Sequence, residues 1–250
     1  MAEIPYQNME GTSQAAKTLT THLDPESQVE IRGMTFSEES IRKGFIRKVY
    51  LILTVQLAIT MAFIALFVYN DSAKLWTINN PWIAVTSFVV MFGVLIIMAC
   101  CGEIRRKTPH NFIFLAIFTV AQGLMLGIFT IRYDAQEVFT AVGITCAICF
   151  GLTLFSLQTK WDFTMMGGFL FVALLLVFLF GIIVAFFPGS VASSVYSACG
   201  ALLFSFYLVY DTQMMMGGNH KYSISPEEYI FAALNLYLDI INIFLFILRR

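Results

Sequence analysis

The sequence predicts an all-α polytopic membrane protein with seven transmembrane helices, and two observations support this fold class. Composition is the first, because 58% of the 250 residues are hydrophobic, only 12% are charged, and the mean hydropathy is +0.77. A soluble domain carries a charged share of about 25%. The second observation is that the apolar residues gather in seven runs of about 20 residues, the helix length that crosses a hydrocarbon core of roughly 30 Å.

The seven runs follow one another along the chain and are almost free of charge. Asp239 is the only Asp, Glu, Lys or Arg in any of them. Because a backbone in hydrocarbon must pair its polar groups internally, each run is expected to be a helix. The predicted spans are Val49–Tyr69, Trp82–Gly102, Phe112–Ile131, Val138–Leu157, Met165–Phe187, Val191–Tyr210 and Tyr229–Leu248.

The chain divides into a polar start and a membrane domain. Residues 1–40 have low hydrophobicity and no long apolar run, which predicts a disordered cytosolic tail. Residues 41–250 are predicted to form the seven-helix transmembrane domain. Small residues at four-residue spacing, such as Gly123 and Gly127, predict close packing between its helices.

The basic residues between the spans predict the orientation. Nine lie on one side of the membrane, namely Arg42, Lys43, Arg47, Lys48, Arg105, Arg106, Lys107, Lys160 and Lys221, and four lie on the other, namely Lys74, Arg132, Arg249 and Arg250. Basic residues in short loops favour the cytosol, so the amino terminus is expected there. The two final arginines would themselves favour the cytosol. The seventh span is therefore either a crossing helix or a re-entrant one, and both topologies stay open.

Charge distribution and cysteine spacing argue against nucleic-acid binding and against a cysteine metal or redox site. The net charge is −1 and the basic residues lie in short clusters, which leaves no continuous cationic face for nucleic acid. The pair Cys146 and Cys149 has the spacing of a metal or redox site, but no second pair and no nearby His completes it. The sequence predicts no bound cofactor, and the expected partner of most of the surface is the lipid bilayer.

Asp239 is the first candidate for a functional residue. A charged carboxylate in the middle of a span costs about 2.5–3.5 kcal/mol on insertion scales, so its presence needs a reason. Asn235 and Asn242 lie at i−4 and i+3, and the three side chains form a polar stripe on one face of the helix. The stripe is either a hydrogen-bond network that holds the bundle together or part of an ion or proton site.

Asp211, at the end of the sixth span, is the expected partner of Asp239. Tyr207 lies one turn earlier on the same face. Two carboxylates close together in a low dielectric cannot both ionise easily, so the pair can share a proton and respond to pH. Two carboxylates with amide groups and water are also ligands that Ca²⁺ accepts. The pair is therefore compatible with a proton-sensitive gate and with a site that binds, passes or senses Ca²⁺, and the alternative for Asp211 alone is a solvated residue at the membrane edge.

Several motifs in order resemble the Lifeguard branch of the transmembrane Bax inhibitor motif family. They cover the chain from about residue 42 to its end and comprise the stretches Gly44–Tyr50, Phe150–Phe163, Tyr210–Gln213, Ser225–Tyr229 and Leu236–Asn242. The resemblance implies a seven-helix membrane protein of the endoplasmic reticulum or Golgi membrane that is associated with Ca²⁺ leak from stores and with suppression of apoptosis. It also implies that Asp211 and Asp239 form a pH-sensitive latch over a pore. Bacterial relatives add an arginine on the second helix, for which Arg105 and Arg106 are the nearest candidates.

Three functional hypotheses follow. The first is a pH-sensitive calcium leak channel, with Ca²⁺ as the transported ion and no enzymatic activity. The second is a membrane interaction protein that controls cell death through regulator proteins without conducting ions. The third is an intramembrane aspartyl protease, which would need a Gly-x-Gly-Asp context, whereas Asp239 follows Leu236, Tyr237 and Leu238.

Overall fold

The computed structural model describes residues 25–187, 189–217 and 220–249, with side chains from residue 40 onward. This part of the chain contains helices and no strand. The elements are α2 (Pro25–Tyr69), α3 (Asp71–Asn79), α4 (Trp82–Cys100), α5 (Gly102–Arg106), α6 (His110–Thr130), α7 (Ala135–Gln158), η1 (Phe163–Met166), α8 (Gly167–Phe186), α9 (Ser190–Met216), η2 (Pro226–Glu228) and α10 (Tyr229–Leu248).

Seven of these helices are long and apolar enough to cross a membrane, which confirms the predicted fold class. The helical spans are α2, α4, α6, α7, η1 with α8, α9, and η2 with α10. The boundary difference that matters for the candidate site is in α9, which continues six residues beyond the predicted end at Tyr210 to Met216. Asp211 therefore lies inside a helix and not at its end.

The start of α2 falls within the expected disordered tail. This helix begins at Pro25, a residue that fits the first turn of a helix because it has no N–H to lose there. Residues 25–40 are helical, while residues 1–24 lie outside the described residues. The described residues from Phe45 onward form one compact unit that is separate from residues 25–44, and the description below concerns this unit alone.

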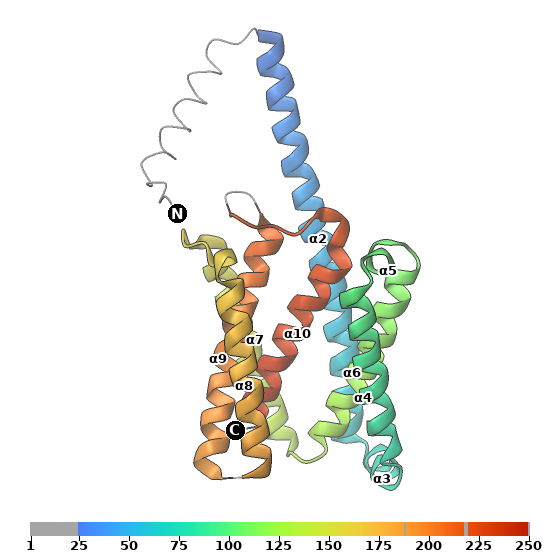
Figure 1. The fold of residues 1–250 in the computed structure, drawn as a ribbon. Coiled ribbons are helices and arrows are strands. Elements are labelled where there is room, and N and C mark those ends of the chain that lie inside the picture. Colours follow the sequence, from blue (N-terminus) through green and yellow to red (C-terminus); the bar gives the residue numbers. More distant parts are fainter. Residues whose placement is uncertain (1–24, 188, 218–219, 250) are drawn as a thin grey trace. The chain divides into compact units, whose positions relative to one another are not determined.

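The central helix of this unit is α10. It packs against α9, α7 and α6, and Figure 1 shows it running between the α4–α6 pair and the α7–α9 group. It is one uninterrupted helix from Tyr229 to Leu248. Its last residues line the same cavity as Asp134 of the α6–α7 connection and Glu137 in the first turn of α7, at the end of the unit opposite to Tyr229. The seventh span is thus long enough to cross the membrane and does not turn back, so the re-entrant alternative is not observed.

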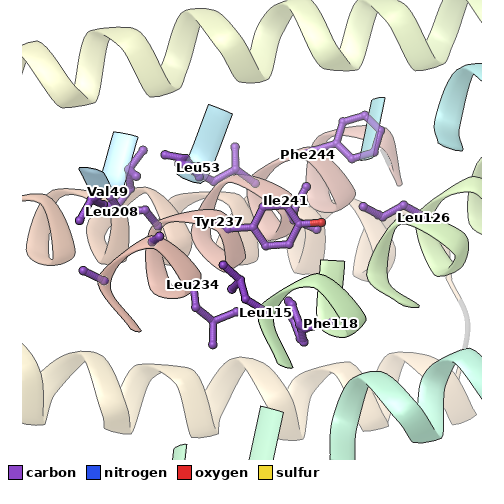
Figure 2. Close-up of a cluster of buried hydrophobic side chains, with 14 of the residues drawn as sticks. Val49, Leu53, Leu115, Phe118, Leu126, Leu208, Leu234, Tyr237, Ile241 and Phe244 are labelled. Atoms are coloured by element: carbon purple, nitrogen blue, oxygen red, sulfur yellow. The ribbon is translucent and has the colours of Figure 1, made fainter. Parts of the chain in front are cut away.

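Tyr237 lies at the centre of the core on the α2 and α6 side of α10 (Figure 2). Its side chain is fully buried, and its ring meets Phe118 edge-on at a centroid distance of 6.1 Å. Its hydroxyl oxygen is 2.7 Å from that of Thr60. Thr60 donates its own proton to the Gln56 carbonyl oxygen, so Tyr237 is the donor between the two hydroxyl groups. This bond connects α10 to α2.

The small residues of α6 permit the close helix packing that their spacing predicts. A Cβ on Gly123 would lie 2.6 Å from the ring of Phe63, and one on Gly127 would overlap the ring of Phe67. Both aromatic side chains belong to α2. The absence of a side chain on these two glycines therefore sets the distance between α2 and α6.

Candidate functional site: a buried carboxyl pair between α9 and α10

The structure brings Asp211 and Asp239 together where α9 packs along α10. The two side chains are within hydrogen-bonding range of each other and are buried, with exposed fractions of 8% and 4%. Oδ2 of Asp239 has no hydrogen-bond partner among the described residues. An ionised carboxylate only accepts hydrogen bonds, so a bond between two carboxyl groups requires one proton between them.

The local sequence explains how α9 carries Asp211 to this position. Thr212 satisfies its hydroxyl inside the helix, because that group donates to the Leu208 carbonyl oxygen at 2.6 Å. The helix ends only at Gly217, whose φ of 59° lies in the left-handed region that glycine adopts readily. The backbone N–H of Gly217 donates to the Gln213 carbonyl oxygen. Asp211 is thus held in the last two turns of a capped helix.

The other members of the expected polar stripe lie near the pair, and none of them forms a hydrogen bond with it among the described residues. Tyr207 is close enough to interact electrostatically with both Asp211 and Asp239. Asn242 donates to the Leu238 carbonyl oxygen of its own helix at 2.8 Å. Asn235 is partly buried on α10. The stripe therefore exists along α10, and its amide groups keep hydrogen-bonding capacity that the pair does not use.

Arg105 and Arg106 do not reach the pair, in contrast to the expected arginine partner. Both guanidinium groups bind Oε1 of Glu228, at the start of α10, and the distance from Nη2 of Arg105 is 2.9 Å. Asp239 lies eleven residues further along α10, about 16 Å at the helical rise of 1.5 Å per residue. The arginines instead fasten α5 to the last residue of η2, directly before α10, and Arg105 also lies 4.5 Å above the ring of Phe231 in the first turn of α10.

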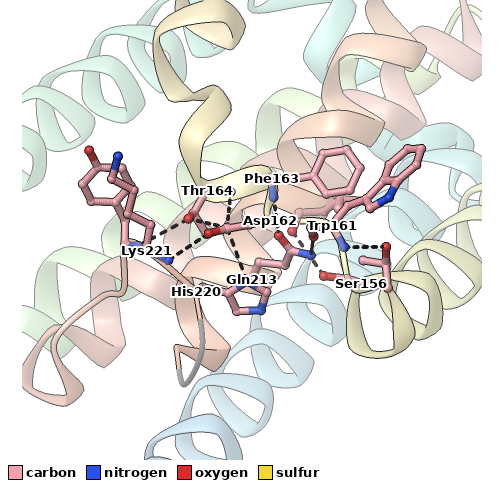
Figure 3. Close-up of polar contacts among 11 residues, drawn as sticks. Ser156, Trp161, Asp162, Phe163, Thr164, Gln213, His220 and Lys221 are labelled. Carbon is pink, nitrogen blue, oxygen red and sulfur yellow. Dashed lines mark hydrogen bonds and ion pairs between the residues drawn. The ribbon is translucent and has the colours of Figure 1, made fainter. Parts of the chain in front are cut away.

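A second polar cluster lies close to the pair and was not predicted from the sequence (Figure 3). Gln213, one helical position beyond Thr212, is completely buried. Its Oε1 accepts from the backbone N–H of Phe163 at 2.7 Å, and its Nε2 donates to the carbonyl oxygen of Trp161 at 2.9 Å. Gln213 therefore holds the α7–α8 connection against α9, two residues from Asp211. The available signal was that Gln213 and Trp161 both lie in stretches that carry the family resemblance.

Asp162 extends this cluster to the connection between α9 and α10. Its Oδ1 accepts from the backbone N–H and the hydroxyl of Thr164, and its Oδ2 accepts from the backbone N–H of Lys221 at 2.9 Å. Nδ1 of His220 is 3.3 Å from Oδ1. Burial by itself raises the pKa of Asp162, but these hydrogen bonds and the neighbouring His220 hold that pKa below its ordinary value. We call Asp162, Thr164, Gln213, His220 and Lys221 the loop clasp.

The carboxyl pair by itself supplies too few ligands to complete the shell of a cation. Within the described residues, no group of three or more His, Cys, Asp or Glu side chains is placed to hold a metal ion. Asp211 and Asp239 supply four carboxyl oxygens. A hard cation such as Ca²⁺ takes six to eight oxygen ligands, so carbonyl groups or water would have to complete its shell.

Comparison with known proteins agrees with this architecture. A family model described as "Inhibitor of apoptosis-promoting Bax1" matches residues 42–250. Protein lifeguard 3 from Homo sapiens is 39% identical over 218 residues, which cover 86% of this chain and 70% of that protein. Bax inhibitor 1 from Schizosaccharomyces pombe is 38% identical over 214 residues, covering 84% and 77% of the two chains. The similarity to the Lifeguard proteins confirms the resemblance seen in the motifs. The chain therefore belongs to the Bax inhibitor family of multi-pass membrane proteins.

Proposed function

We propose that this protein is a pH-sensitive calcium leak channel of an intracellular membrane, the endoplasmic reticulum or the Golgi, and that it suppresses apoptosis by lowering the calcium content of the store. Asp211 and Asp239 are its gate. Ca²⁺ is the transported ion, and the role is not enzymatic. The observation that carries the proposal is the close approach of two buried carboxyl groups inside membrane-spanning helices.

The contact gives the gate a defined response to protons. With one shared proton, the two carboxyl groups hydrogen bond and hold α9 against α10. When that proton is lost, two negative charges face each other in a medium of low dielectric and repel. Because α10 is the central helix, its displacement would loosen contacts on both of its sides. A higher pH should therefore favour the open state.

The same carboxyl groups suit the proposed ion. Once ionised and separated, they offer hard oxygen ligands of the kind that Ca²⁺ prefers, with water supplying the rest of the shell. Asn242 lies one turn along α10 from Asp239 and is partly exposed, so it provides the next polar group on the helix. An unpaired carboxyl oxygen on Asp239 is available to begin this coordination.

The names of the relatives support the proposed cellular role, and the distribution of basic residues supports the proposed orientation. The family description and the name of the fission yeast relative both refer to inhibition of Bax, and we extend that role to this chain. Arg47, Arg105 and Lys160 belong to the more basic edge of the membrane domain. That edge is assigned to the cytosol, which places the amino terminus there.

Calcium flux into proteoliposomes tests the proposal. For the wild type, the leak should rise between about pH 5 and pH 8 as the shared proton is lost. Asp211→Asn and Asp239→Asn should each give a smaller leak at the upper end of this range and a flat pH profile. The reason is that an amide can donate to the remaining carboxylate at every pH, so the contact persists without a shared proton.

Asp71→Asn is the matched control, because Asp71 is an exposed carboxylate in α3, and its flux should equal that of the wild type. A wild-type protein that passes no Ca²⁺ at any pH would exclude the channel and favour a role through cell-death regulators as binding partners. Labelling by a transition-state-analogue inhibitor of aspartyl proteases would overturn the non-enzymatic assignment.

A further inference from the structure

A cavity of about 370 Å³ lies between α4, α6, α9 and α10, in the half of the membrane domain that contains the end of α10. We call it the α4–α10 cavity. Leu126 of α6 forms the part of its wall that meets the core (Figure 2). On the outer side, half of the surface of Phe88 is exposed. The cavity therefore opens toward the surface that the bilayer covers.

Most of the wall is apolar and matches lipid chains. Phe88 and Met91 come from α4, and Met125 and Phe129 come from α6. The sulfur and aromatic groups of such side chains pack against irregular apolar shapes. A hydrocarbon tail is thus the natural filling for this part of the cavity, but an apolar wall alone does not select one occupant.

Gln122 is the first feature that points to a specific ligand. It lines the cavity, its exposed fraction is only 7%, and its amide makes no hydrogen bond to any residue that the structure describes. An amide without a partner in an apolar surrounding favours a ligand that can pair with it. Asn242 lies on the opposite wall and uses its amide N–H on Leu238, which leaves its carbonyl oxygen available. The occupant should carry oxygen atoms that accept from Gln122 within an otherwise apolar body.

Arg249 is the second feature, and it supplies a charge. Its side chain lines the cavity, and its guanidinium carbon lies 4.9 Å above the ring of Tyr196. None of the described residues lining the cavity is acidic. At 1.5 Å per residue, Arg249 lies about 10 Å from Asn242 along the axis of α10, toward the membrane edge. The cavity is thus cationic at the edge, amide-lined further in and apolar elsewhere.

We infer that the α4–α10 cavity binds a glycerophospholipid with an anionic headgroup. Its phosphate pairs with the planar guanidinium of Arg249, which matches phosphate oxygens with parallel donors. Its ester oxygens accept from Gln122, and its chains cover the apolar wall. A zwitterionic choline lipid would bring a second cation beside Arg249, and a sterol would leave the guanidinium without an anion. This inference does not depend on the calcium leak.

Native mass spectrometry of the purified full chain tests the inference with dioleoyl phosphatidylglycerol, dioleoyl phosphatidylcholine and cholesterol as separate probes. The wild type should retain phosphatidylglycerol about tenfold more tightly than phosphatidylcholine. Arg249→Gln should remove this preference. Gln122→Leu should weaken the binding of both phospholipids and leave the ratio of the two affinities unchanged, because the ester groups are common to both lipids.

Arg132→Gln is the matched control, since Arg132 is an exposed arginine in the α6–α7 connection that does not line the cavity. It should leave both affinities unchanged. The inference would be overturned if the wild type bound the two phospholipids equally, or if Arg132→Gln lost the preference as Arg249→Gln does. It would also be overturned if cholesterol bound more tightly than phosphatidylglycerol, or if the spectrum showed a protein dimer in place of a lipid adduct. The ratio of affinities remains readable even if a variant is less stable.

Discussion

Gln213 shows how a single polar side chain can organise the neighbourhood of the carboxyl pair. It is completely buried, yet both ends of its amide are bonded to backbone groups of the α7–α8 connection. Such fully satisfied polar groups fix one arrangement of the chain because any other leaves them unpaired. We therefore expect Gln213 to hold the end of α9 in the position that brings Asp211 to Asp239.

Replacing Gln213 with Leu should lower stability strongly. The substitution leaves the N–H of Phe163 and the carbonyl of Trp161 without partners, at about 1–3 kcal/mol for each group that stays buried. Thermal unfolding in detergent measures the effect. Gln158→Leu is the control, because Gln158 is exposed at the end of α7, and a comparable loss in that variant would contradict the role assigned to Gln213.

Asp162 should stabilise the protein at neutral pH and not in strong acid. Its folded pKa is lower than its ordinary value of 3.8, so its stabilisation is fully present above about 3.8 and is lost as the pH falls through the lower folded value. Asp162→Asn should therefore be less stable than the wild type at pH 7, by an amount that screening by solvent keeps modest.

Unfolding curves at neutral and strongly acidic pH check this expectation. The difference in unfolding free energy between the wild type and Asp162→Asn should shrink as the pH falls below the ordinary carboxyl range. A difference that grows toward acid would show that the sign is wrong. Because Asp162 stays ionised at neutral pH, its own titration does not account for a change of flux there, and the variant should keep the direction of the wild-type pH profile.

At the scale of elements, α6 and α2 depend on glycine for their close approach. Gly127→Ala should destabilise the protein by about 1–3 kcal/mol, because the added methyl group overlaps the ring of Phe67. Gly143→Ala in α7 is the matched control, since nothing lies within 4 Å of a Cβ there. Unfolding measurements that rank the two variants in the opposite order would contradict the packing described here.

An aromatic contact also stabilises the packing of α9 against α10, and it lies nearer to the end of α10 than the carboxyl pair does. Phe246 of α10 packs between Tyr196 and Phe204 of α9, with ring centroids 5.2 and 5.9 Å away, and lies over the bare backbone of Gly200. Phe246 also lines the α4–α10 cavity. One side chain therefore contributes both to the helix pair that carries the gate and to the inferred lipid site.

For the whole molecule, the seven crossing helices of the described residues are an odd number, so the two ends of the membrane domain lie on opposite sides of the membrane. Under the proposed orientation, a glycosylation acceptor sequence fused after Arg250 should receive a glycan in cells, and the same sequence fused before Met1 should not. The excess of basic residues on the edge that includes Arg47 and Arg105 is the physical reason. Glycan on the amino-terminal fusion would reverse the orientation, and glycan on neither would contradict the crossing of α10.

The sequence by itself determined the seven spans and their approximate limits, together with the two carboxylates that needed explanation. Lipid accepts only long apolar helices, so crossing the membrane is a property of each segment that can be recognised along the chain. Asp239 stood out for the same reason, because charge inside such a segment is costly.

Only the tertiary structure decided which faces of these helices meet. It placed Asp211 against Asp239, directed Arg105 and Arg106 to Glu228, and buried Gln213 in the loop clasp. Helices in lipid are nearly as apolar on one face as on another, so hydropathy carries little information about their rotation or their neighbours. Those choices depend on shape, on small residues and on a few hydrogen bonds between distant segments, and these form only when the helices pack together.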